Sequence, residues 1–367
     1  IRVFGFEVFN NVDSYKIYRD FVDFIEGNFS LKDNKVNELE LRPLKPEELE
    51  NLKNRDPEKL KKLIEFQTKL QYFYTKALEE GRFNSKENIV FFPFLHKATQ
   101  NGKAYVYKQG NIYVLSGKKL TDEEIRLANK SNDIIKQYLP KFNSKLYIVP
   151  GIEEDNASHS NRDGVSFVIG GKYKDQDLFT KGDDTLSHEL GHLILEELNP
   201  KFRATKNTEA GIIHESFADT VAFLESTRDK SNREKLNLDN LYKENPISLI
   251  GEIKGDNQRK IRTLWTQTDY KKLKESEFPE GHTFSVPITE SLYHLWANLV
   301  EKSIKQGKTK DEAIDYATNT LKQIVINAAK KSDPTIDSYV KNLIQSTNNN
   351  ELKEILVNEF KKRNLIQ

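Results

Sequence analysis

The sequence of residues 185–226 predicts two helices joined by a polar loop, and this pair restricts the possible folds more than any other stretch. Thr185–Leu198 repeats leucine and isoleucine at helical spacing and ends before Pro200, which cannot continue a helix. Gly211–Ser226 has a second helical pattern. The interval between the two is long enough for a helix end, a reversing loop and an antiparallel second helix. We therefore expect the two helices to lie against each other.

Each predicted helix carries a pair of polar side chains at four-residue spacing, which places them on one face. His188 and His192 can direct their imidazole nitrogens at one tetrahedral metal ion. Glu189 lies beside them, in a position to take a proton from water at the metal rather than to bind the metal. On the second helix, Glu215 can ligate zinc, while Asp219 can accept the outer N–H of a ligand histidine and fix its tautomer.

The first pair alone also fits a helix with two ordinary surface or core histidines. A catalytic zinc needs a third protein ligand and an open position for water. Glu215 and His214 compete for that third place, and because they are neighbours in a helix only one of them can point toward His188. A metzincin site is excluded, since Leu195 and Leu198 stand where it needs glycine and histidine and its methionine turn cannot form without methionine.

The combination of His-Glu-Leu-Gly-His at residues 188–192 and Glu-x-x-x-Asp within residues 211–219 resembles the gluzincin metallopeptidases, and among them the thermolysin-like family. The resemblance covers about residues 155–300. It implies an α+β fold with a zincin-type catalytic domain, in which a mixed sheet and an active-site helix face a helical C-terminal lobe. The implied zinc ligands are His188, His192 and Glu215, with Glu189 as general base and acid and Asp219 behind a ligand histidine. We expect zinc only, because no Asp-rich loop has a calcium-ligand rhythm.

Two weaker similarities extend the resemblance. His282, within Gly281–Ile288, matches a segment whose histidine reaches the oxyanion of the tetrahedral intermediate, although a turn histidine that caps the following helix is the alternative. Arg259 matches an arginine that lines the substrate pocket and contacts the substrate carbonyl, although a lone arginine in a basic helix is usually solvated. We therefore expect His282 to be catalytic and Arg259 to bind substrate.

The sequence departs from the family at two places. His214 stands where the family usually has asparagine, and residues 193–213 contain no tyrosine to assist the oxyanion. Before the strand Val165–Ile169, where the family has an edge strand that pairs with extended substrate, the sequence matches only at Asp163–Gly164. Stabilisation of the transition state then depends more on zinc and His282, or on a tyrosine from elsewhere in the chain.

Composition excludes several classes of protein. The chain has 57 basic and 56 acidic side chains and a formal net charge of +1, so no global field attracts nucleic acid or an anionic membrane. It has no cysteine, which leaves histidine and carboxylate as metal ligands. No apolar run reaches the length of a membrane span, about 18 residues. Ile1 cannot be a translation start, so the N-terminus is processed, trimmed or altered, and no signal peptide is visible. We expect a secreted or cell-surface protein, and any signal peptide of its precursor would have been removed before Ile1.

We expect three parts along the chain: an N-terminal accessory domain of unknown role over residues 1–100, a catalytic lobe with a sheet and the His-Glu helix over 101–198, and a mainly helical lobe with the third ligand over 199–367. The predicted strands are Ile1–Phe9, Ile89–Phe94, Tyr105–Tyr107, Ile112–Leu115, Leu146–Val149 and Val165–Gly170. The further predicted helices begin near Pro46, Pro57, Thr121 (with a capping box to Glu124, ending at Tyr138) and Ile288.

These patterns predict a zinc-dependent endopeptidase that hydrolyses peptide or protein substrates with metal-activated water. One alternative is a catalytically inactive binding protein with a zincin fold, but the intact Glu189 argues against it, because that residue adds little to metal affinity. A peptidase toxin with one dedicated protein target is another alternative. An aminopeptidase would need a carboxylate cluster for the substrate amine, and the Gly-rich segment that typically carries it is not visible.

Overall fold

The computed structural model describes residues 26, 29–40, 45–65, 103–151, 157–162, 164–182, 184–205, 207–251, 262–275 and 281–367. The chain is α+β, with one mixed sheet and many helices, as predicted. It divides into two compact units. One unit, here called the sheet unit, comprises Arg2–Lys130 and Asn143–Thr180, and the other, the helical unit, comprises Ser131–Phe142 and Lys181–Gln367.

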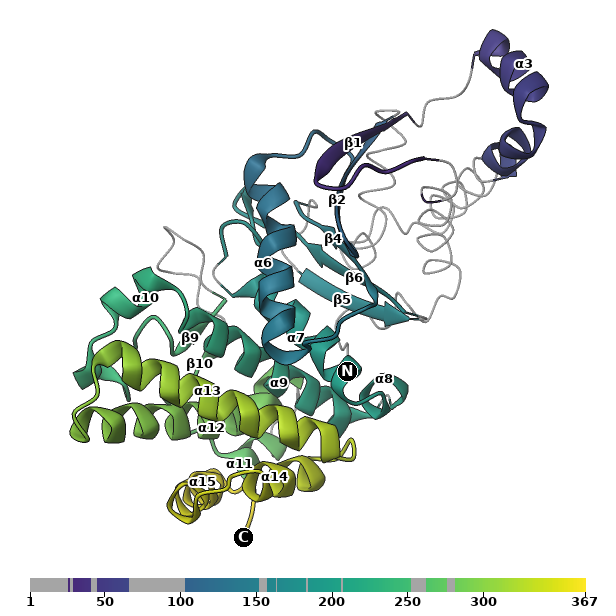
Figure 1. The fold of residues 1–367 in the computed structure, drawn as a ribbon. Coiled ribbons are helices and arrows are strands. Elements are labelled where there is room, and N and C mark those ends of the chain that lie inside the picture. The colour runs from purple at the N-terminus through teal and green to yellow at the C-terminus, as the bar shows by residue number, and fades with distance from the viewer. Residues whose placement is uncertain are drawn as a thin grey trace. The chain divides into compact units, whose positions relative to one another are not determined.

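The sheet unit contains a six-stranded sheet in the order β1-β2-β3-β4-β6-β5 (Figure 1). The strands are β1 (Lys35–Glu40), β2 (Lys103–Gln109), β3 (Ile112–Ser116), β4 (Lys145–Val149), β5 (Ala157–Arg162) and β6 (Val165–Gly170). β3, β4 and β6 run parallel, whereas β1 pairs antiparallel with β2, β2 with β3, and β5 with β6. Among the described strands, β1 and β5 therefore form the two edges. A small pair, β7 (Lys172–Tyr173) and β8 (Gln176–Asp177), lies outside this sheet.

The predicted strands and helix of this region are confirmed. β6 is buried along its whole length and β4 along all but one residue, which is why both are nearly continuous apolar runs. Gly110 turns the β2–β3 hairpin with a φ of +57°, a conformation that favours glycine. Helix α6 (Asp122–Tyr138) begins with the predicted capping box, in which Thr121 and Glu124 exchange hydrogen bonds of 3.1 and 3.2 Å.

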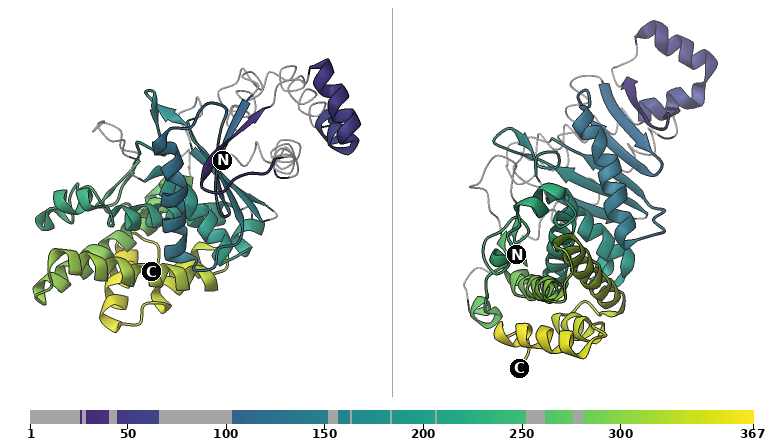
Figure 2. Two further views of the ribbon diagram at one scale, coloured as in Figure 1. Left: turned by 45° about the horizontal axis from the view of Figure 1, so that its top comes forward. Right: turned by 60° about the vertical axis from the view of Figure 1, so that its left-hand side comes forward.

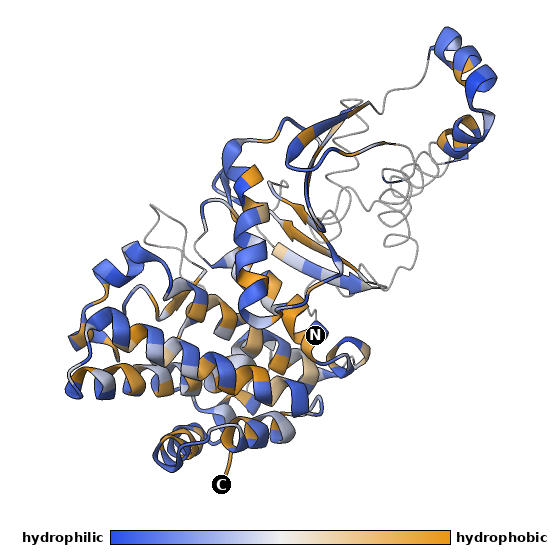
Figure 3. Ribbon diagram, in the orientation of Figure 1, coloured by the Kyte–Doolittle hydropathy of each residue, from blue (hydrophilic) through white to orange (hydrophobic). Residues whose placement is uncertain are grey.

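The first hundred residues contribute a strand to the sheet as well as helices. β1 pairs along its whole length with β2, so residues 35–40 belong to the same sheet as residues 103–170. Helix α3 (Pro46–Arg55) begins with Pro46, as predicted, and buries none of its residues, in accord with its hydrophilic colouring in Figure 3. The helix predicted from Pro57 is present over 57–65. Its continuation, and the strands predicted at Ile1–Phe9 and Ile89–Phe94, lie outside the described residues.

The helical unit is built around helices far apart in the sequence. Its helices are α7 (Thr185–Leu198), α8 (Lys201–Ala204), α9 (Thr208–Ser226), α10 (Lys230–Lys235), α11 (Tyr270–Lys274), α12 (Gly281–Lys305), α13 (Lys310–Lys331), α14 (Ile336–Gln345) and α15 (Asn350–Lys362), with a short pair β9 (Leu249–Ile250) and β10 (Arg262–Thr263). α9 packs against both α7 and α12, and α13 lies alongside α12 (Figure 2). The predicted helix 185–198 is confirmed, and the second begins at Thr208 instead of Gly211.

The start of α12 differs from the prediction. The sequence predicted a helix that begins near Ile288, but the helix already begins at Gly281 and contains Pro287. The hydroxyl of Ser285 donates a hydrogen bond of 2.7 Å to the backbone carbonyl of His282 in the first turns. The prediction was wrong here because proline removes only one backbone hydrogen bond, and packing of the apolar residues beyond it maintains the helix. His282 is consequently a helical residue, not a turn residue.

A buried charge network fixes the segment after β10 against α12. Arg363 and Glu290 are both fully buried, and Nε of Arg363 donates to Oε2 of Glu290 at 2.9 Å. Arg363 also donates to the carbonyl of Thr266 at 2.8 Å, while the backbone N–H and the hydroxyl of Thr268 each donate to Glu290 at 2.7 Å.

Among the described residues, no helix is both long and apolar enough to cross a membrane.

Candidate metal centre

Helices α7 and α9 approach until their backbones are in contact at Gly191. A Cβ atom at this position would lie 2.7 Å from Cα of Ala218 and 3.3 Å from its Cβ. Contacts under 3.0 Å are essentially never made by real Cβ atoms, so the pair of helices requires glycine here. The close approach brings side chains of α9 within reach of His188 and His192 on α7.

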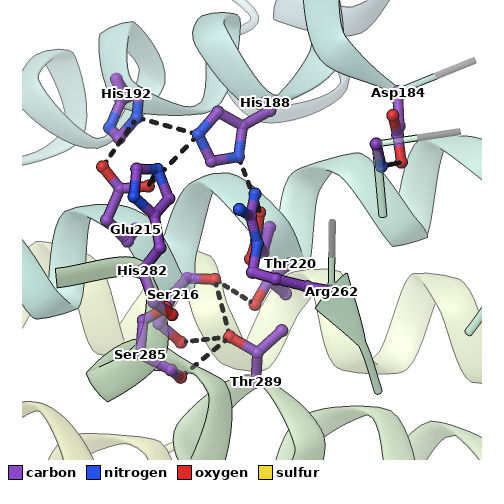
Figure 4. Close-up of polar contacts among 12 residues, drawn as sticks. Asp184, His188, His192, Glu215, Ser216, Thr220, Arg262, His282, Ser285 and Thr289 are labelled. Atoms are coloured by element: carbon purple, nitrogen blue, oxygen red, sulfur yellow. Dashed lines mark hydrogen bonds and ion pairs between the residues drawn. The ribbon is translucent and has the colours of Figure 1, made fainter. Parts of the chain in front are cut away.

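His188, His192 and Glu215 bring three metal-binding atoms together (Figure 4). The Nε2 atoms of His188 and His192 are 3.2 Å apart. Nε2 of His188 lies 3.3 Å from Oε2 of Glu215, and Nε2 of His192 lies 3.6 Å from Oε1. All three residues are buried, and the group could hold a metal ion.

The separations within this group fit tetrahedral coordination. Bonds of about 2.0–2.1 Å from zinc to nitrogen or oxygen imply distances of about 3.3–3.4 Å between neighbouring ligand atoms. The two histidine nitrogens are 3.2 Å apart and Nε2 of His188 lies 3.3 Å from Oε2 of Glu215, close to that distance, while Nε2 of His192 lies 3.6 Å from the other oxygen, Oε1. The donors therefore fit a metal ion in both chemistry and spacing.

Asp219 and Arg262 hold the outer side of the His188 ring. Nδ1 of His188 lies 2.7 Å from Oδ1 of Asp219, which directs Nε2 toward the group of donor atoms. Arg262 donates to both oxygens of Asp219, from Nε at 2.5 Å and from Nη2 at 2.7 Å. Asp219 is fully buried, so this bidentate pair supplies its neutralising charge. The predicted contact of Asp219 with His188 is thus present in the structure.

The electrostatics of the centre follow from burial and close charges. Burial alone would lower the pKa of His188, but the hydrogen bond and charge of Asp219, with those of Glu215, raise it to about 10. Burial would raise the pKa of Glu215, but the charges of His282 and His192 hold it well below its usual range. The pKa of Asp219 is also lowered, since Arg262 and His188 outweigh the effect of burial. The centre thus keeps both carboxylates ionised, as ligation requires.

His282 reaches the centre from the first turn of α12. Its Nε2 lies 2.8 Å from Oε2 of Glu215, and its ring stacks on that of His188 with centroids 6.0 Å apart (Figure 4). A contact of 2.9 Å between the hydroxyls of Ser216 and Thr289 ties α12 to α9. The structure therefore brings His282 to the predicted centre, where its partner is the carboxylate of Glu215.

His214, the rival third ligand, lies on the other side of His192. Its Nδ1 is 3.3 Å from Nδ1 of His192, and its Nε2 is 3.2 Å from the carbonyl oxygen of Phe202. The group of converging donor atoms includes Glu215 and not His214. The expectation that the two neighbours point in different directions is confirmed.

Asp184 stabilises the region in front of α7. It is almost completely buried, and its Oδ2 accepts a hydrogen bond of 2.8 Å from the backbone N–H of Gly251. Burial raises the pKa of this carboxyl group to about 7. The contact joins the start of α7 to the residue that follows β9.

Of the other predicted site residues, some lie within the described part of the chain and some lie outside it. Glu189 is buried on α7, directly after His188. Arg259 and Asp163 lie outside the described residues. Arg262 was missed by the sequence analysis, because nothing in its local pattern distinguishes it from the neighbouring basic residues; only its pairing with Asp219 identifies it.

Comparisons with known proteins identify no family for this chain. No protein-family profile matches the chain, and no curated protein is detectably similar to it. The chemistry of the centre therefore has to be argued from its own residues.

Proposed function

We propose that this protein is a zinc-dependent peptidase with a zincin-type catalytic domain, related in its site to the gluzincins. The observation that carries the proposal is the buried group of His188, His192 and Glu215, whose donor atoms are 3.2–3.6 Å apart. Two imidazoles and one carboxylate are a ligand set of catalytic zinc sites, which leave a coordination position for water. A structural zinc site, by contrast, usually has four protein ligands and often thiolates, and this chain has no cysteine.

The roles of the surrounding residues follow from their positions. A bound zinc ion would supply a Lewis acid that polarises the attacking water and the scissile carbonyl. Glu189 is the proposed general base, which accepts the proton of the water and delivers it to the leaving amine. Asp219 and Arg262 orient His188. His282 is the proposed donor to the oxyanion, a role in which its Nε2 exchanges Glu215 for the substrate oxygen.

The mode of cleavage is the second part of the proposal. We favour an endopeptidase, because the sequence shows no Gly-rich segment of the kind that carries the amine-binding carboxylates of related aminopeptidases. A peptide blocked at both termini and carrying an internal fluorophore and quencher tests this directly. Cleavage of the blocked peptide supports an endopeptidase, whereas cleavage only of the peptide with a free amine contradicts it.

The variant Glu189→Gln tests the reaction. It should bind zinc with the stoichiometry of the parent, because Glu189 is not among the converging ligands. It should hydrolyse casein and the blocked peptide about 10²–10⁴-fold more slowly, the usual contribution of a general acid–base group. Glu197→Gln is the matched control on the same helix; Glu197 pairs with Arg203 at 3.0 Å, away from the ligands, and this variant should keep full activity. Equal rates for Glu189→Gln and the parent would sink the assignment.

A further inference from the structure

The outer nitrogen of His192 has a partner of a different kind from that of His188. Nδ1 of His188 meets a carboxylate, that of Asp219, at 2.7 Å. Nδ1 of His192 meets another imidazole nitrogen, Nδ1 of His214, at 3.3 Å. His214 is buried and precedes the ligand Glu215 on α9. The two ligand histidines are thus supported by unlike groups.

The directions of the hydrogen bonds follow from the ligand role of His192. If its Nε2 binds a metal ion, the remaining ring proton of His192 is on Nδ1, which must then donate. Nδ1 of His214 must accept this hydrogen bond, so it carries no proton. The proton of neutral His214 is then on Nε2, and Nε2 lies 3.2 Å from the carbonyl oxygen of Phe202, which can only accept. In this row of hydrogen bonds from His192 through His214 to Phe202, each donor thus faces an acceptor.

A carboxylate lies near His214, and a cation lies near that carboxylate. Oε1 of Glu196 lies 3.9 Å from Nε2 of His214, beyond hydrogen-bonding distance. Nε of Arg203 lies 3.7 Å from the other oxygen of Glu196, and this cation offsets the carboxylate. The nearer acceptor for Nε2 is the carbonyl of Phe202.

We propose that His214 is a positioning residue for the metal centre: as the neutral Nε2–H tautomer it accepts the N–H of His192 and is itself anchored on the carbonyl of Phe202. This inference rests on the proposed metal centre, and it adds a residue whose loss weakens metal binding without removing a ligand. Groups that hold metal-ligating histidines typically change metal affinity about 10–100-fold when they are removed.

Three substitutions separate this role from simple packing. In His214→Asn, the side-chain oxygen can occupy the place of Nδ1 and accept from His192. His214→Gln can still reach the carbonyl of Phe202 but does not place an acceptor at that point, and His214→Leu supplies neither contact. Zinc affinity, measured by competition with a chromophoric chelator, should fall about 10–100-fold in His214→Leu and less than about 5-fold in His214→Asn. His214→Gln should resemble the leucine variant.

Two further measurements keep the test independent of hydrolysis. Denaturant unfolding of the metal-free variants reports any loss of fold, and the absorption spectrum of the cobalt-substituted protein reports ligand geometry, which should change in His214→Leu. Long-range ¹H–¹⁵N correlation spectra of the zinc-loaded parent should show His214 protonated on Nε2 alone.

The inference is overturned if His214 is protonated on Nδ1, or if His214→Leu binds zinc within about 2-fold of the parent. Intact zinc binding without any peptide hydrolysis by the parent would contradict the proposed function and leave the positioning role of His214 standing. A parent protein that binds no zinc would refute both.

Discussion

Substitution of Gly191 by alanine tests whether the contact between α7 and α9 sets the spacing of the metal ligands. The new Cβ would lie 2.7 Å from Cα of Ala218, whereas ordinary van der Waals contact begins at 3.4 Å. The helices must therefore separate by about 0.7 Å at this point, because a backbone atom cannot turn away as a side chain can. Overpacking of this kind costs about 1–3 kcal/mol. The better helix propensity of alanine returns about 1 kcal/mol.

The expected result is a net loss of up to about 2 kcal/mol in the free energy of unfolding of the metal-free protein. Urea unfolding measures this loss. Zinc affinity should also fall, because His188 and His192 would move away from Glu215. Gly281→Ala is the control, since a Cβ at Gly281 meets nothing within 4 Å. Adding Ala218→Gly should not rescue Gly191→Ala, because the closest contact is with backbone. Full rescue, or unchanged stability and affinity in Gly191→Ala, would refute the reasoning.

Three further predictions concern charge and metal. Arg262→Gln leaves the buried carboxylate of Asp219 without its bidentate partner and should cost about 3–5 kcal/mol of stability in urea unfolding; a cost below about 1 kcal/mol would contradict this. The folded-state pKa of Asp184, about 7, exceeds the ordinary value of an aspartate, 3.8, so the folded state binds more protons between these values and stability falls as pH rises through that window. This loss of stability, about 4 kcal/mol, should be absent in Asp184→Asn. A variant with the same dependence of stability on pH as the parent would refute the assignment of the loss to Asp184. Chelation should lower the melting temperature, and zinc at 100 times its Kd should restore about 2.7 kcal/mol; equal melting temperatures with and without zinc would contradict a metal centre.

The centre was predictable from sequence to the extent that it depends on single helices. Helical spacing alone places His188 and His192 on one face of α7, and the same spacing places Glu215 and Asp219 together on α9. Asn199 and Pro200 mark where α7 ends, so the turn toward α9 was also visible. These features are local, and the physical rules behind them need no knowledge of the rest of the fold.

Features that depend on distant packing were not predictable. Arg262 reaches Asp219 only because β10 pairs with β9 and the following segment is fixed by Arg363. The early start of α12 could not be inferred, since Pro287 is a local signal against helix that packing of the helix overrides. β1 joins the sheet through a partner strand many residues away, which no window of sequence reveals.

The position of β1 at one edge of the sheet has a consequence for the order of folding. β2 and β3 are joined by a two-residue turn and can pair early. Pairing of β1 with β2 must instead close the loop between residues 40 and 103, which costs about 4 kcal/mol in chain entropy. Within the described residues, β1 pairs with β2 and with no other strand of the sheet. It should therefore dock late and detach first, with amide hydrogens that exchange faster than those of β4. Each time it detaches, the backbone groups of β2 become an open template for another chain, so aggregation should begin at this edge of the sheet.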